Sequence, residues 1–195
     1  MTKSQSKELP SIRTVGHSAQ ALSAFVDLLR VHGVKQVVDV RTVPRSRHNP
    51  QFNRDTLPQA LGAAGIAYEH MRGLGGLRRP KPDSINTAWR NASFRGFADY
   101  MQTAEFETSL TALIDLARVT QTAVMCAEAV PWRCHRFLIA DALVVHGVPV
   151  EHILSPTQRR PHVLTPWARV NGDRLTYPAA RDLSTNRKLL HDALG

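Results

Sequence analysis

The sequence contains only two cysteines, Cys126 and Cys134, among its 195 residues. So few thiols in a chain with no sign of export argue against a structural disulfide and indicate free cysteines. The two stand eight positions apart across one predicted loop, so a reversible pair remains the alternative.

Long apolar runs are also absent. No stretch approaches the roughly 20 apolar residues of a membrane-spanning helix. The polar opening, MTKSQSKELP, lacks the apolar region of a signal peptide. We therefore expect no membrane partner, a disordered tail over residues 1–10, and a cytoplasmic protein.

Lysine and aromatic residues are scarce. Lysines account for five of the 25 basic residues, and aromatic residues for 6% of the chain. The arginine excess gives a net charge of +9, and guanidinium groups suit phosphate and carboxylate, so a small anionic ligand is the expected partner. A genome-wide preference for arginine is the alternative explanation. Nucleic acid is a second candidate partner, bound weakly and without sequence preference, because no helix carries a base-reading pattern.

Apolar periodicity predicts alternating strands and helices. The expected N-caps of the first two helices are Ser18 and Asn53. Strands are expected over residues 11–16, 34–40, 66–70, 123–125 and 148–154, and helices over residues 19–33, 52–64, 89–118 (two helices meeting near Thr103) and from residue 134 to Gly147. This order predicts a three-layer α/β fold, with a mostly parallel, Rossmann-like sheet and helices on both faces.

The domain boundaries follow from a change in composition. Residues 11–154 form the predicted α/β domain, and residues 155–195 a polar, proline-containing extension packed on it. Within the extension, Asn171-Gly172 between alternating residues is typical of a β-hairpin with a type I′ turn.

The most informative stretch is Thr122 to Leu143, TAVMCAEAVPWRCHRFLIADAL. A short apolar strand ends at Cys126, a loop follows, and Cys134 begins a helical pattern. Ligands of open α/β sheets bind at such strand-to-helix junctions, where helix N-termini present unpaired N–H groups.

Reactive and cationic residues also cluster in the other loops that leave the strands. These loops are residues 17–18, 41–47, 71–79 and 126–136. Because the carboxyl ends of parallel strands share one edge of the sheet, the four loops are expected to meet. The glycine-rich third loop matches no phosphate-loop pattern and is interpreted as a flexible lid.

We assign the candidate catalytic roles to Cys126, Cys134, Glu128 and His17. Cys134, at a helix start beside arginines, is expected to have a lowered pKa. Each assignment has a structural alternative: a buried Cys126, an inert Cys134 buried behind Trp132, a paired Glu128, a turn residue at position 17.

Three chemistries fit these residue types. A thiolate nucleophile is the first, although tyrosine-phosphatase and sulfurtransferase loops need an arginine about six residues after the cysteine, and Arg133 is one further. Zinc is the second, with Cys126, Cys134 and His135 as ligands; there is no CxxC pair and adjacent ligands are unusual, so we predict no metal and no cofactor. The third is a binding pocket without chemistry.

Several motifs together resemble the domain-of-unknown-function family 488. They are TVGHS (14–18), VVDVRTVPRSR (37–47), FN (52–53), GIAYEH (65–70), LGG (74–76) and CAEAVPWRCHRFLIADAL (126–143). The resemblance implies a compact intracellular α/β protein and supplies no reaction. It carries the four candidate catalytic residues, and a set of candidate anion-binding residues, onto this chain: Arg41, Ser46, Arg136, His135, Ser18 and Asp39.

The sequence thus predicts an enzyme that acts on a phosphorylated or otherwise anionic small molecule, with nucleotides among the candidates. The alternative is a non-catalytic nucleic-acid or nucleotide binding module. Oligomeric state is left open.

Overall fold

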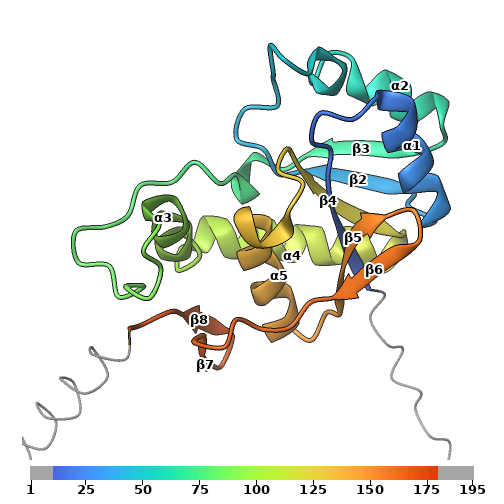
Figure 1. The fold of residues 1–195 in the computed structure, drawn as a ribbon. Coiled ribbons are helices and arrows are strands. Elements are labelled where there is room, and N and C mark those ends of the chain that lie inside the picture. The colour runs from blue at the N-terminus through green and yellow to red at the C-terminus, as the bar shows by residue number, and fades with distance from the viewer. Residues whose placement is uncertain (1–10, 180–195) are drawn as a thin grey trace, which may run out of the picture.

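The computed structural model describes residues 11–179 (Figure 1). The predicted disordered tail, residues 1–10, and the end of the extension, residues 180–195, lie outside this range. The strands are β1 (Ile12–Gly16), β2 (Gln36–Asp39), β3 (Ala67–His70), β4 (Thr122–Cys126), β5 (Val150–Ser155), β6 (Gln158–Pro161), β7 (Arg169–Asn171) and β8 (Arg174–Thr176). The helices are α1 (Leu22–Val31), α2 (Leu57–Ala63), α3 (Ala92–Tyr100), α4 (Ala104–Val119) and α5 (Arg136–Val145).

Six strands form one sheet in the order β3-β2-β4-β1-β5-β6. The first five are parallel, and β6 pairs with β5 in the antiparallel sense. The prediction of a mostly parallel α/β sheet is confirmed. Because β4 lies between β1 and β2, the loop after Cys126 is flanked by the loops after Gly16 and Asp39.

Helices cover both faces of the sheet. Alternate residues of the inner strands point to opposite sides, so Val37 and Ala123 pack with α1 and α2, whereas Val38 and Val124 pack with α3, α4 and α5. Two buried clusters result, one on each face, and Figure 1 shows α1 and α2 together, apart from α3, α4 and α5. The three-layer prediction is therefore confirmed.

The predicted caps of the first two helices are wrong. α1 begins at Leu22 after Ala21, and α2 at Leu57 after Thr56. The backbone N–H of Ser18 instead donates to Ala127, which prolongs the pairing of β1 with β4 and delays the helix. Asn53 instead stabilises the loop of residues 41–47, because its Oδ1 accepts a hydrogen bond from the N–H of Ser46 at 2.6 Å.

The junction near Thr103 occurs as predicted. The Thr103 hydroxyl oxygen accepts from the N–H of Phe106, so this side chain caps α4 after α3 has ended at Tyr100. Both helices pack into the larger core cluster.

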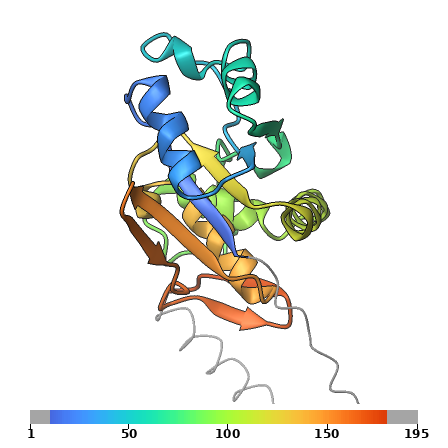
Figure 2. The same cartoon turned by 90° about the vertical axis from the view of Figure 1, so that its right-hand side faces the viewer.

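The C-terminal hairpin is present, but its turn differs from the prediction. Asn171 pairs with Arg174, so Gly172 and Asp173 are the central residues of the turn. Gly172 has φ of 59°, whereas Ser18 is the only non-glycine at positive φ among residues 11–179. A type I′ turn needs positive φ at both central positions and is therefore excluded. In Figure 2 the hairpin lies at the lower end of the molecule.

Two residues near the end of the described range, Leu175 and Tyr177, pack against the helices of the α/β fold. Leu175 and Tyr177 are buried in the larger core cluster, and the Tyr177 hydroxyl donates to Asp141 on α5 at 2.8 Å. Within residues 11–179, none of the helices is both long and apolar enough to cross a bilayer.

Candidate functional site

A cleft of about 640 Å³ lies at the carboxyl edge of the sheet. Eight of the ten predicted site residues line it: His17, Ser18, Arg41, Ser46, Cys126, Glu128, Cys134 and His135. Asp39 and Arg136 do not. The remaining lining comes from Ala19, Thr42, Val43, Arg45, Asn49, Gly76, Leu77, Ser93, Phe94, Ala127 and Arg133.

Two of the loops that line the cleft, the one after β1 and the one after β4, are in close contact. His17 N–H donates to the carbonyl of Cys126 at 3.0 Å, directly beyond β1. A Cβ on Gly16 would collide with the carbonyl of Glu128, so only glycine lets the two loops lie this close. The thiol of Cys126 is therefore held beside the loop that carries His17.

Asp39 orients Arg41 and does not itself face the cleft. Its buried carboxylate accepts from Nε of Arg41 at 2.9 Å and from a terminal guanidinium nitrogen at 2.6 Å. Burial would lower the pKa of Arg41, but the Asp39 hydrogen bond and charge outweigh it and the pKa is raised. Asp39 is thus paired with Arg41 and is not among the residues that line the cleft, and its anion-binding role stays a prediction.

The His17 ring is fixed by neighbours on both sides. Nδ1 donates to the carbonyl of Ser18 at 2.8 Å, which leaves Nε2 to accept from Arg41 at 3.2 Å. The ring stacks on Phe52 with centroids 4.1 Å apart. Burial lowers the pKa of His17 despite the Ser18 carbonyl, so the ring stays neutral and helps to orient Arg41.

Arg136 supports the loop from beneath. It is buried, and its two terminal nitrogens donate to the carbonyls of Glu128 and Ala129. Arg136 is not among the residues that line the cleft, because its guanidinium holds the loop that carries Glu128; its anion-binding role stays a prediction. The Glu128 carboxylate is exposed at the cleft and accepts from the N–H of Val130 at 3.1 Å.

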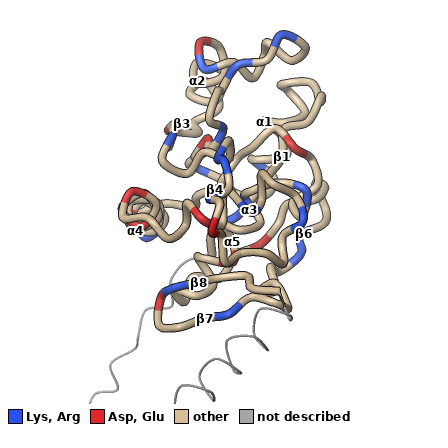
Figure 3. Tube along the Cα trace, turned by 90° about the vertical axis from the view of Figure 1, so that its left-hand side faces the viewer, with Lys and Arg blue, Asp and Glu red and all other residues tan. Residues whose placement is uncertain are grey.

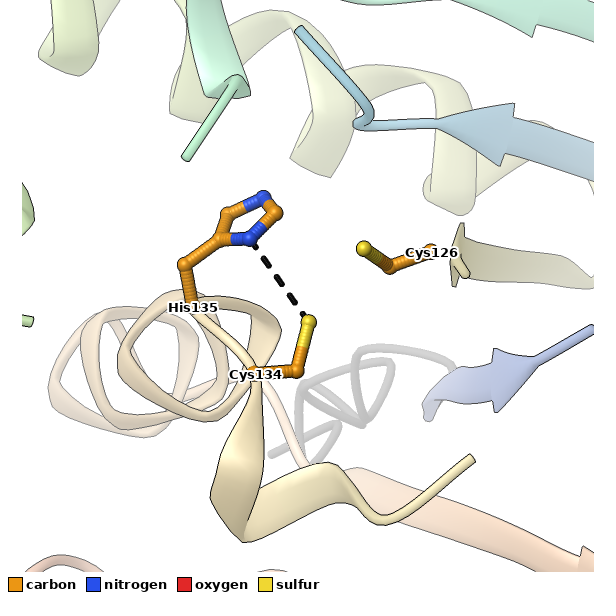
Figure 4. A group of neighbouring side chains, drawn as sticks. All are labelled: Cys126, Cys134 and His135. Atoms are coloured by element: carbon orange, nitrogen blue, oxygen red, sulfur yellow. Dashed lines mark hydrogen bonds between the residues drawn. The ribbon is translucent and has the colours of Figure 1, made fainter. Parts of the chain in front are cut away.

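The two thiols and an imidazole meet at the centre of the cleft. Cys126 ends β4, and Cys134 and His135 directly precede α5, yet their sulfur and nitrogen atoms all lie within 4.8 Å of one another. Figure 4 shows the three side chains pointing toward a common space. His135 Nε2 donates to the carbonyl of Val40 at 3.0 Å, so Nδ1 faces Cys134 Sγ, 3.6 Å away.

The acidic thiol is Cys126, and the expectation for Cys134 is wrong. A hydrogen bond from the Cys134 thiol lowers the pKa of Cys126 well below its ordinary value, and His135 and Arg136 add to this effect. The same shared hydrogen, together with burial, raises the pKa of Cys134. Cys134 lies before the helix and is almost fully buried, so solvent and the helix N-terminus stabilise its thiolate less than expected.

One of the comparisons with known proteins identifies the family of this chain. The model of the family described as domain of unknown function DUF488 matches residues 21–143, which is more than half of the chain. The chain belongs to the DUF488 family. Neither the curated proteins nor the solved structures contain a match.

Two cations of the DUF488 cleft were predicted from the sequence only as members of the clustered loops. Arg45 and Arg133 are exposed and line the cleft, and neither was among the ten candidate site residues. The role of Gly76 could not have been found from the sequence, because it depends on a tertiary contact. A Cβ at this position would collide with the His135 imidazole. The glycine-rich segment therefore packs directly on the thiol–imidazole group.

Alkylation of the DUF488 thiols should separate them. In reduced protein freed of metal ions, we expect iodoacetamide to modify Cys126 faster than Cys134 at pH 7, because the thiolate is the nucleophile. The rate at Cys126 should fall only when the pH drops below the lowered pKa. Peptide mapping by mass spectrometry against pH measures both sites. Equal rates, or a faster Cys134, would contradict the assignment.

Proposed function

We propose that this protein is an enzyme that binds a phosphorylated or otherwise anionic small molecule in the cleft and acts on it there. The observation that carries the proposal is the meeting of a thiol–imidazole group with exposed arginines in one cleft. The volume, about 640 Å³, suits a molecule as large as a nucleotide.

Arg45 and Arg133 are the groups proposed to hold the anion. Both line the cleft and are exposed, whereas the charge of Arg41 is compensated by Asp39 at 2.6 Å. A guanidinium that is free of a carboxylate partner offers its paired N–H groups to a phosphate. Ser18 and Ser46, which also line the cleft, add hydroxyl donors.

The proposed chemistry is assigned to Cys126, Cys134 and His135, with Glu128 as an acid or base. The Glu128 carboxylate stands at the cleft and is exposed, so a proton can exchange with solvent. Both cysteines are free, and a site that needs two reduced thiols suits a reducing compartment, so we propose that the protein acts in the cytoplasm.

Anion binding is tested by removing the two exposed arginines. We expect isothermal titration with inorganic phosphate and with a nucleoside monophosphate to show binding to the native protein, and the double variant Arg45→Ala/Arg133→Ala to lose at least about tenfold in affinity, since each charge-assisted contact contributes about 1.5 kcal/mol or more. Arg118→Ala/Arg169→Ala removes the same charge at exposed positions outside the cleft lining and is the matched control. Equal losses in both variants would show only a general charge effect.

Catalysis and binding alone predict different responses to the same variants. An enzyme should lose turnover in Cys126→Ser while keeping its affinity for the anion, and a binding module should tolerate that change. The screen for turnover uses phosphorylated and other anionic metabolite classes with the native protein as reference.

The second candidate is a non-catalytic nucleic-acid binding module. It is favoured by the exposed strand β6, which carries Arg159 and Arg160, and by arginines on the hairpin; Figure 3 marks basic positions in both. Arg159 is already paired with Glu151 at 2.9 Å. A titration with short single- and double-stranded oligonucleotides at two salt concentrations decides between the candidates, because phosphate contacts weaken steeply with salt.

A further inference from the structure

We propose that Cys126, Cys134 and His135 form a binding site for one zinc ion that opens onto the cleft. This inference goes beyond the proposed function and does not rest on it, since metal uptake is measured without any substrate. It reverses the prediction of no metal, which was based on the absence of a CxxC pair from the sequence.

The donor atoms already lie at nearly the right separations. In a tetrahedral zinc site with bonds of about 2.3 Å to sulfur and 2.0 Å to nitrogen, neighbouring donors are about 3.5 to 3.8 Å apart. Cys134 Sγ and His135 Nδ1 are 3.6 Å apart. All three donors lie within 4.8 Å of one another, so small side-chain rotations bring them to bonding distance. Figure 4 shows that they come from the end of β4 and the start of α5.

The imidazole is set in the tautomer that a metal needs. The carbonyl of Val40 can only accept a hydrogen bond, so His135 Nε2, 3.0 Å away, carries the hydrogen. Nδ1 is then left as an acceptor that faces the sulfur atoms. Ligating histidines almost always have such a carbonyl or carboxylate partner on the second nitrogen, which fixes the ring. Phe97 packs edge-on against the same ring, with centroids 5.1 Å apart.

The types of donor select the metal. Two thiolates and one imidazole suit zinc, whereas magnesium and calcium take oxygen ligands. Two thiolates also balance the charge of a divalent ion. The three donors occupy only part of a tetrahedron and line the cleft with Arg133, so the fourth position is available to water or to an oxygen of an anionic ligand. Sites with three protein ligands and one open position are typical of catalytic zinc.

The test uses cobalt as a coloured substitute for zinc. Reduced, chelator-treated protein is titrated with Co²⁺ under nitrogen. We expect one equivalent to bind with the visible absorption of a tetrahedral site and the ultraviolet charge-transfer band of thiolate ligands, and one equivalent of Zn²⁺ to displace it. Mg²⁺ should displace nothing.

Variants identify the ligands. Cys126→Ser, Cys134→Ser and His135→Ala should each lower zinc affinity by more than the roughly 100-fold typical of a lost outer-shell partner. His48→Ala, which removes an exposed histidine outside the cleft lining, should leave the affinity unchanged. If a variant does not fold, the native protein still decides, because bound zinc should protect both cysteines from alkylation and raise the melting temperature.

Failure of this inference is distinct from failure of the proposed function. Native protein that takes up no Co²⁺ or Zn²⁺ when fully reduced, or uptake that persists in Cys126→Ser/Cys134→Ser, overturns the zinc site. Reduced protein that instead oxidises readily to a Cys126–Cys134 disulfide without binding zinc also overturns it. Loss of phosphate binding in Arg45→Ala/Arg133→Ala concerns the anion site and is measured in metal-free protein.

Discussion

Replacing Asp39 by asparagine is expected to lower the free energy of unfolding by about 4 kcal/mol, because breaking a buried ion pair leaves an uncompensated charge. Asp39 is fully buried and Arg41 is only 7% exposed. The carboxylate also accepts from the N–H of Arg41 at 3.0 Å and from the Tyr68 hydroxyl at 2.8 Å. An amide can accept some of these bonds, but its NH₂ group faces donors.

Urea denaturation followed by circular dichroism measures this loss. The matched control is Asp115→Asn, which breaks an exposed i,i+3 pair with Arg118; its effect should be close to zero, because surface ion pairs contribute little. If Asp39→Asn unfolds at the same urea concentration as the native protein, Arg41 has another compensating partner and the description of this pair is wrong.

Asp141→Asn is expected to cost about 3 kcal/mol and to loosen the C-terminal extension. The buried carboxylate of Asp141 receives hydrogen bonds from His162 at 2.8 Å, from both the N–H and the hydroxyl of Thr165, and from Tyr177. One side chain on α5 thus fastens three points of the segment that follows β6. The amide nitrogen of asparagine would face donors and leave some of them unsatisfied.

Two measurements check this second effect. Urea denaturation gives the loss of stability, and hydrogen exchange by mass spectrometry should show faster exchange over residues 162–177 than in the native protein. Unchanged protection of that segment, with stability lost elsewhere, would mean that its packing and not Asp141 holds the extension in place.

The sequence was sufficient for the fold class and for the order of strands and helices along the chain. The nearly continuous apolar strand around Val37 and Val38 predicted a parallel strand buried on both faces, and glycines after the helices marked their ends. The caps were not predictable, because Ser18 and Asn53 satisfy partners in other elements. The order of the strands in the sheet could not be predicted either, because nothing in the sequence near β4 indicates that this strand separates β1 from β2.

The candidate site, like the fold, could be predicted only in part. Loops at one sheet edge could be predicted from parallel topology, so the cleft residues His17, Arg41, Cys126 and Cys134 were found. The sequence could not show which side chains are already engaged in structural hydrogen bonds, because this depends on three-dimensional contacts. Arg136 illustrates this: the sequence places it beside Cys134, and only the fold turns its guanidinium toward the loop carbonyls.

The most direct test of the central claim, that this cleft binds an anion, is a titration of ¹⁵N-labelled, metal-free protein with inorganic phosphate, followed by NMR. The account predicts that amide signals of Arg45, Arg133 and Cys126 shift together along one binding curve, while those of β6 and the hairpin stay in place. Shifts confined to β6 and the hairpin, or no saturable shift in the cleft, would contradict it.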